Sequence, residues 1–179
     1  MKAIRSEGRI LLCEGYKDVL AFHASGIRYA VGLCGTALTE EHIRAIRRLA
    51  GQVTLSLDPD PAGRQNTVRC AHMLLSEGCA VSLLPLPDGM DPDEVYRRKG
   101  SDELARLARE GTLDYLSYRI RQAASRPHTD TAAINETLGE IGLLSSPLAV
   151  YRRIGELSGA TGIPIEVLRQ EISVATGPK

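Results

Sequence analysis

The sequence predicts an α/β protein in which a mostly parallel sheet is flanked by helices and followed by a small α-helical subdomain. Between residues 9 and 85, short runs of Val, Ile and Leu alternate with longer stretches of helical character, and after Pro92 the strand character disappears. Strands that are separated by single helices are joined by right-handed crossovers, which place the strands parallel in one sheet.

The elements can be placed in order along the chain. We expect strands at 10–13, 29–33, 53–57 and 80–84, and helices at 17–24, 40–49 and 62–76. Gly26, Gly51 and Gly78 fall near helix ends just before the next strand, where a residue that tolerates positive φ is favoured. The rest of the chain is predicted to be helical, with breaks at 100, 111, 126–128, 145–147 and 162–164. We therefore expect an α/β domain over 1–111 and a helical bundle subdomain over 112–179.

Composition narrows the class of protein. The 179 residues are 43% hydrophobic, which is enough for a core, and the 22 basic and 22 acidic side chains give no net charge. A neutral chain with no Trp and one Phe is neither a basic DNA-coating protein nor a protein that binds single strands by aromatic stacking. The cysteines form no C-x-x-C pair, and no signal peptide or membrane-spanning run is evident, so we expect a cytoplasmic protein without a membrane partner.

Three acidic clusters follow predicted strands. Glu14 and Asp18 come after the first strand, Asp58 and Asp60 after the third, and a further cluster at 91–93 after the fourth. Loops at the carboxyl ends of parallel strands converge on one edge of the sheet, so these acids are expected to meet in space. Gathered carboxylates repel one another unless a cation lies among them, and oxygen ligands favour Mg²⁺ or Mn²⁺.

Each cluster also has a structural interpretation. Asp60 is a good helix N-cap with Pro61 at the first helical position, and Asp91 with Pro92 has the same pattern. Asp60 could cap a helix and bind a metal at the same time. Asp58 has no capping role, so it discriminates better between the structural and the metal-binding interpretation. Independent capping does not predict three acidic clusters at three strand ends. Lys17 is a candidate contact for phosphate, and Arg64 is a candidate contact for nucleotide or nucleic acid.

Four segments together resemble the Toprim motifs of bacterial DnaG-type DNA primases, in order and in spacing. They are EGYKDV at 14–19, GTALT at 35–39, DPDPAG at 58–63 and DPD at 91–93. The resemblance covers essentially the whole chain and implies the Toprim fold, the catalytic portion of the primase RNA polymerase core. One departure is Pro59, where the family usually has Gly between the two aspartates; Pro fixes φ and removes an N–H.

The resemblance also implies the site. Glu14 would be the Toprim glutamate, which either binds metal or shuttles a proton. The implied metal ligands are Glu14, Asp58, Asp60 and Asp91, with Glu14, Asp58 and Asp60 as catalytic residues and Asp18 and Asp93 as supporting acids.

The implied activity is DNA-templated synthesis of short RNA primers by metal-dependent nucleotidyl transfer. Its partners would be a single-stranded DNA template, nucleoside triphosphates, and the replicative helicase through a domain that finds no counterpart in this sequence. The zinc-binding domain and the basic half of the polymerase core find none either. We therefore expect this fragment to hold metal and to prime weakly or not at all.

Other functions fit parts of the pattern. A Toprim-type metal-dependent nuclease would use the same acids to hydrolyse phosphodiesters. A receiver-like domain would accept a phosphoryl group on Asp58, although the helical tail and the lack of a suitable Lys after the last strand argue against it. A topoisomerase is disfavoured because the chain offers no distinct tyrosine-bearing domain. Residues 112–179 alone would suit a role in docking a partner.

Overall fold

The chain forms two compact units. The computed structural model describes residues 1–126 and 131–175, with side chains through residue 172. Contacts divide the chain into Met1–Leu113 and Asp114–Lys179. This boundary lies two residues beyond the one expected from the sequence between residues 111 and 112.

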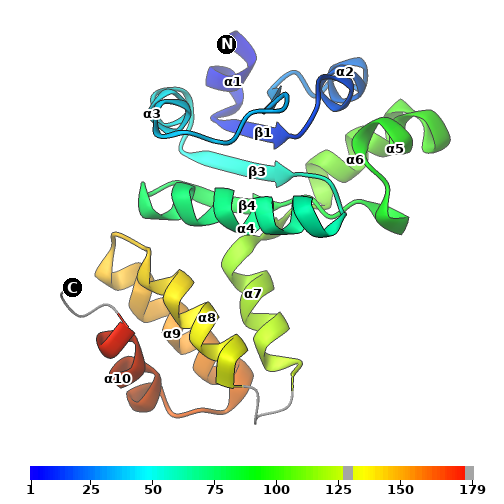
Figure 1. Cartoon of the computed structure of the whole chain (residues 1–179). Coiled ribbons are helices and arrows are strands. Elements are labelled where there is room, and N and C mark those ends of the chain that lie inside the picture. Colours follow the sequence, from blue (N-terminus) through cyan, green and yellow to red (C-terminus); the bar gives the residue numbers. More distant parts are fainter. Residues whose placement is uncertain (127–130, 176–179) are drawn as a thin grey trace. The chain divides into compact units, whose positions relative to one another are not determined.

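The sheet has the strand order β2-β1-β3-β4-β5, and all of its strands except the end of β5 lie in the first unit. Figure 1 shows the strands β1, β3 and β4. The strands are β1 (Arg9–Cys13), β2 (Ala30–Gly32), β3 (Gln52–Ser56), β4 (Ala80–Leu83) and β5 (Leu113–Asp114). Strand β1 pairs in parallel with both β2 and β3, and the central strand β3 also pairs in parallel with β4. The predicted parallel sheet is thereby confirmed.

Helices cover both faces of this sheet. They are α1 (Lys2–Glu7), α2 (Tyr16–Ala24), α3 (Glu40–Leu49), α4 (Pro61–Ser76), α5 (Pro92–Lys99) and α6 (Ser101–Glu110), with a 3₁₀ turn, η1, at Pro87–Gly89. Right-handed crossovers place α3 and α4 together on one face and α2 on the other, where α2 also packs against α5 and α6. The four residues Ile10 to Cys13 are all buried because β1 is covered on both faces.

Several local expectations need correction. Helix α1 and the two-residue strand β5 were not predicted from the sequence, since each is too short to carry a periodic pattern. Gly26 and Gly78 have φ of +80° and +77°, as expected, but Gly51 does not adopt a positive φ. The reason is local: α3 ends in extended backbone at Ala50, with φ −159°, and needs no left-handed residue.

The second unit is helical. It contains α7 (Tyr115–Ala124), α8 (Thr131–Gly142), α9 (Pro147–Thr161) and α10 (Ile165–Ala175). The breaks predicted at 145–147 and 162–164 separate α8, α9 and α10, and the break predicted at 126–128 lies outside the described residues from 127 onward. Among the described residues, none of the helices has the length and apolar character that a membrane crossing requires.

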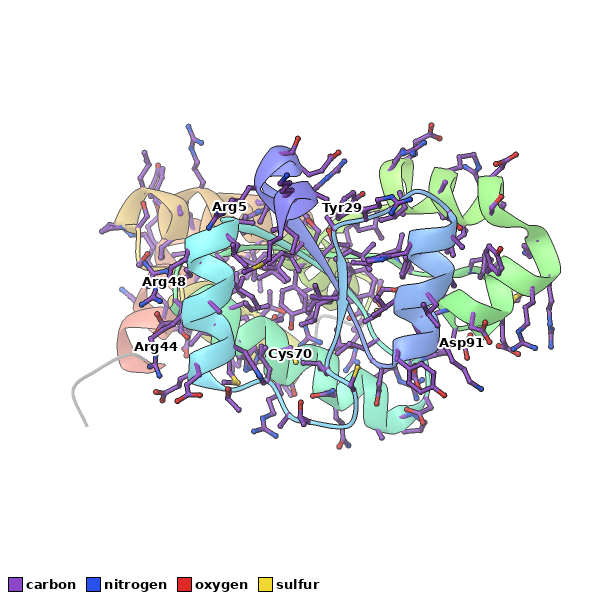
Figure 2. All side chains as sticks on the ribbon, turned by 90° about the horizontal axis from the view of Figure 1, so that it is seen from above. Arg5, Tyr29, Arg44, Arg48, Cys70 and Asp91 are labelled. Carbon is purple, nitrogen blue, oxygen red and sulfur yellow. The ribbon has the colours of Figure 1, made fainter. Side chains whose placement is uncertain are left out.

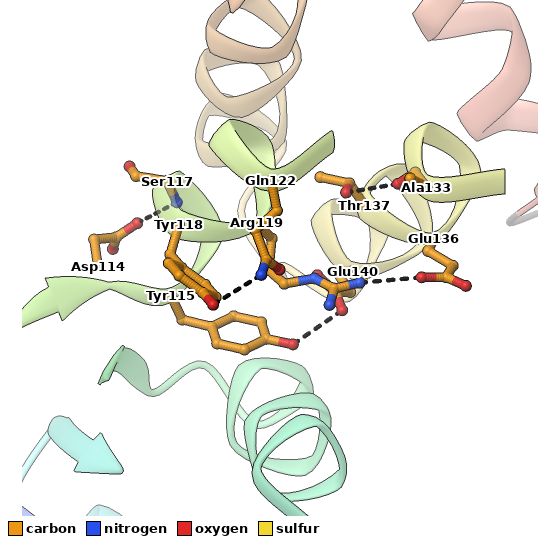
Figure 3. A network of polar contacts seen from close by, with 10 residues as sticks. All are labelled: Asp114, Tyr115, Ser117, Tyr118, Arg119, Gln122, Ala133, Glu136, Thr137 and Glu140. Carbon is orange, nitrogen blue, oxygen red and sulfur yellow. Dashed lines mark hydrogen bonds and ion pairs between the residues drawn. The ribbon is translucent and has the colours of Figure 1, made fainter. Parts of the chain in front are cut away.

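A buried polar network joins α7 to α8 (Figure 3). The hydroxyl of Tyr115 donates to Oε1 of Glu140 at 2.9 Å, and Nε of Arg119 donates to Oε2 of the same carboxylate at 3.0 Å. Glu140 is 3% exposed, so its charge needs both partners. Burial, and then the Glu140 charge, raise the pKa of Tyr115 and keep it a donor. The network fixes how α7 packs on α8.

Candidate metal centre and active site

The ends of β1 and β3 bring Glu14 and Asp58 together. Cys13 pairs with Ser56 in the parallel register, so the residues that follow these two strands leave the sheet side by side. The carboxylate of Glu14 accepts a long hydrogen bond, 3.4 Å, from the backbone N–H of Asp58. Two acids that lie 44 positions apart in the sequence are therefore neighbours, as the parallel-sheet prediction requires.

Asp18 holds the turn between β1 and α2. Its Oδ2 accepts a hydrogen bond of 2.9 Å from the N–H of Gly15, the N-cap residue of α2. A side chain at Gly15 would place Cβ 3.3 Å from the same oxygen, so a larger residue would crowd the carboxylate. Asp18 is only 6% exposed. This carboxylate is thus a buried part of the loop that carries Glu14.

The acids that follow β4 begin α5. Asp91 is the N-cap, with Oδ1 accepting from the N–H of Glu94 at 2.6 Å, and Pro92 is the first helical residue. This confirms the predicted helix start. Asp93, two residues on, forms an ion pair of 3.0 Å with Arg97. Figure 2 shows Asp91 beside α2 at the right, whereas Arg44 and Arg48 lie on α3 at the left.

Helix α4 starts against Asp58. Asp60 is its N-cap, with Oδ1 accepting from the N–H of Gly63 at 2.6 Å, and Pro61 follows at the first helical position, as predicted. A Cβ at Gly63 would lie 2.1 Å from the carbonyl oxygen of Asp58. Only glycine allows this approach. Arg64 donates to the carbonyl of Pro59 and lines a separate open pocket on α4.

Most of the predicted site residues line one cleft of about 290 Å³. Its lining residues are Glu14, Gly15, Tyr16, Lys17, Asp18, Asp58, Asp91, Asp93 and Arg97. The three acidic clusters therefore meet there, and Lys17 joins them. The two predicted site residues that do not line this cleft are Asp60 and Arg64.

Negative charge accumulates in the cleft. The pKa of Asp58 is raised to about 6, first by burial and then by the charges of Glu14, Asp18 and other nearby aspartates. Burial also raises the pKa of Asp18, the N–H of Gly15 opposes that shift, and the Asp91 charge adds to it. Mutual repulsion of this kind is what a bound cation relieves.

The donor chemistry fits a hard divalent cation, since the acidic side chains offer only oxygen atoms. The side chains are nevertheless engaged elsewhere: Asp91 caps α5 and Asp93 pairs with Arg97. Within residues 1–126 and 131–175, no three His, Cys, Asp or Glu side chains are grouped closely enough to hold a metal ion as they stand. The residues therefore fit a metal by chemistry and charge, and the carboxylates would have to reorient around it.

The predicted site residues do not include two side chains that line the cleft and one glycine that supports it. Tyr16 and Arg97 line the cleft, and Gly63 allows α4 to approach Asp58. Signals for two of them were present: Arg97 lies one helical turn after Asp93, and a glycine in the first turn of a helix is a sign of close packing. Tyr16 lies inside the first acidic motif, where no neighbouring residue in the sequence would activate its phenol.

Residues 11–96, which include most of the parallel sheet and the acids of the cleft, match the Toprim-like family. The chain as a whole is homologous to the catalytic core of bacterial DnaG-type DNA primases. A DNA primase from Halalkalibacterium halodurans is 32% identical over 174 residues, which are 94% of this chain and 29% of that protein.

Solved structures agree with this relationship. The zinc-binding and RNA polymerase domains of the Aquifex aeolicus primase match with a TM-score of 0.80 and 29% identity, over 94% of this chain and 41% of that one. A DnaG primase catalytic domain bound to single-stranded DNA matches with a TM-score of 0.72 and 27% identity, over 92% and 56%. The chain spans only 29–30% of the length of the primases that it matches in sequence.

Proposed function

We propose that this chain supplies the metal-binding part of a primase active site, in which short RNA primers are made on a DNA template by nucleotidyl transfer. The observation that carries the proposal is the cleft that joins Glu14 and Asp58 to Asp91 at the carboxyl edge of a Toprim-like sheet. Homology to primases over nearly the whole chain supports the same reaction, and the reported relatives are neither nucleases nor receiver domains.

Primases of this family depend on a metal ion. We infer Mg²⁺ or Mn²⁺ because the ligands would be carboxylate oxygens: Glu14, Asp58, Asp60 and Asp91. A metal held by these residues would supply positive charge that neutralises the triphosphate and would help to ionise the attacking 3′ hydroxyl. Asp60 does not line the cleft, because its carboxylate caps α4, but its charge reaches Asp58 and helps to raise the pKa of that residue.

The remaining residues would take roles around the metal. Glu14 would complete the ligand set or move a proton, and Asp18 would hold the Glu14 loop through its bond to Gly15. Asp93 would add negative charge at the rim. Lys17 lines the cleft and would contact the nucleotide phosphates, whereas Arg64 would contact nucleic acid outside it.

The whole protein would need more than this chain. A related catalytic domain has been solved with single-stranded DNA, which supports a DNA template as partner. Nucleoside triphosphates would be the substrates, and a replicative helicase would be contacted through another domain, at the replication fork in the cytoplasm. Because the chain spans less than a third of its relatives, we expect the isolated fragment to prime weakly or not at all. Met1–Leu113 would be the Toprim catalytic domain and the second unit the helical bundle of the core.

The test replaces ligands in the intact primase. Asp58→Asn and Asp60→Asn should each lower primer synthesis by about a hundredfold or more, because loss of a metal ligand removes several kcal/mol of charge stabilisation. Asp102→Asn is the control, since Asp102 is an acid in the first turn of α6 that does not line the cleft. Primer synthesis by Asp58→Asn at the wild-type rate would end the assignment.

A further inference from the structure

Arg97 is a basic side chain inside the acidic cleft. It extends from α5, and together with Lys17 it supplies the positive charge among the lining residues of that cleft. Its Nε donates to Oδ2 of Asp93 at 3.0 Å, and 63% of the side chain is exposed. The next residue, Arg98, makes an equivalent ion pair of 3.3 Å with Glu94 but does not line the cleft.

The charges of the cleft make the ion pair between Arg97 and Asp93 depend on whether a metal ion is bound. With no metal bound, the guanidinium lowers the repulsion among Asp93 and the neighbouring carboxylates. A divalent ion held by those carboxylates would repel the guanidinium and compete with it for the oxygens of Asp93. The pair is exposed and spans i,i+4 on one helix, so it is a weak pair that a competing charge can break.

We propose that Arg97 exchanges partners: it pairs with Asp93 in the metal-free protein and, once metal is bound, contacts the phosphates of the nucleoside triphosphate. The inference rests on the proposed function. A guanidinium offers paired N–H donors that match phosphate oxygens, and the exposed Arg97 can turn from the rim of the cleft toward a ligand inside it. Arg97 is thus assigned as a substrate-binding residue that also tunes metal affinity.

The first measurement is Mn²⁺ binding to the 179-residue chain by calorimetry. Arg97→Gln should bind Mn²⁺ about threefold to tenfold more tightly than the wild type, because a positive charge beside the ligands is removed. Arg98→Gln, the matched control on the adjacent position, should keep the wild-type affinity. Equal Mn²⁺ affinities in the two variants would overturn the inference.

The second measurement is ATP binding at saturating Mn²⁺. Arg97→Gln should bind ATP about tenfold more weakly, Arg97→Lys should lose less, and Arg98→Gln should match the wild type. Opposite changes in metal and nucleotide affinity cannot come from partial unfolding, which weakens both. Unchanged ATP affinity in Arg97→Gln would also overturn the inference.

These results are separable from the proposed function. If no variant and no wild-type sample binds Mn²⁺, both the metal site and the role of Arg97 are wrong. If Mn²⁺ binds but Arg97→Gln behaves like Arg98→Gln, only the role of Arg97 is wrong, and the effect of Asp58→Asn on primer synthesis still decides the proposed function.

Discussion

Asp58 carries an unfavourable charge in the metal-free protein. Burial and then the nearby acids, Glu14 first among them, raise its pKa to about 6. Asp60, by contrast, accepts a capping bond from the N–H of Gly63. The folded state therefore binds a proton on Asp58 more tightly than the unfolded state does. The stability that protonation contributes is fully present below the unfolded pKa of about 4 and is lost as the pH rises through the folded pKa.

The first prediction follows from that sign. In EDTA, Asp58→Asn should be no more stable than the wild type at pH 4 and more stable by about 1 kcal/mol at pH 8, a value reduced for solvent screening of a half-buried group. Urea unfolding at both pH values measures the difference. A constant stability offset for Asp58→Asn across the pH range would contradict the charge argument.

Gly63 gives a second prediction at the scale of one residue. Because an added Cβ would lie 2.1 Å from the carbonyl oxygen of Asp58, Gly63→Ala should destabilise the protein by about 2 kcal/mol through overpacking. Gly139→Ala in α8 is the contrasting variant: nothing lies within 4 Å of its added methyl, so it should gain about 0.5–1 kcal/mol of helix propensity. Chemical denaturation of the two variants tests both signs, and a neutral Gly63→Ala would disprove the close approach of α4.

At the scale of the element, two helices begin on acids of the site. Asp60 starts α4 and Asp91 starts α5, each with a capping bond of 2.6 Å and a proline at the next position. The same carboxylate thus stabilises a helix end and contributes charge to the edge of the sheet. Stability and metal binding can be separated there, because Asn caps a helix about as well as Asp but carries no charge.

The third prediction uses that separation at Asp91. Asp91→Asn should stay within about 0.5 kcal/mol of wild-type stability, since only the favourable interaction with the helix dipole is lost. Asp91→Ala should lose about 1 kcal/mol because the cap itself is removed. Both should lower Mn²⁺ affinity, measured by calorimetry. Thr39→Ala is the control: it removes the cap of α3, so it should lower stability and leave Mn²⁺ affinity unchanged. If Asp91→Asn bound Mn²⁺ with wild-type affinity, Asp91 would not be a metal ligand.

For the whole molecule, the sequence was sufficient to predict the parallel sheet and the meeting of Glu14 with Asp58. Both follow from chain order, because crossover connections put strand ends on one edge whatever the side chains are. The capping pairs at 60–61 and 91–92 were equally predictable, since they depend on adjacent residues. The sequence did not predict that Arg97 would line the cleft, or that Asp60 would lie outside it. Both depend on which local contacts form once the helices are packed, and the order of residues along the chain does not determine that.

The last prediction concerns where metal acts in the molecule. Every proposed ligand precedes Leu113, so binding should protect only openings of the first unit that disturb the cleft. At a Mn²⁺ concentration of about a hundred times the dissociation constant, the free energy of the openings that expose such amides should rise by up to about 2.7 kcal/mol, and their hydrogen exchange should slow accordingly. Hydrogen exchange should therefore show added protection at the ends of β1 and β3 and none in α8 and α9, with EDTA reversing it. In Asp58→Asn, most of the protection that Mn²⁺ gives against hydrogen exchange should be lost. If Mn²⁺ protected both units equally, its effect would not arise from binding in the cleft.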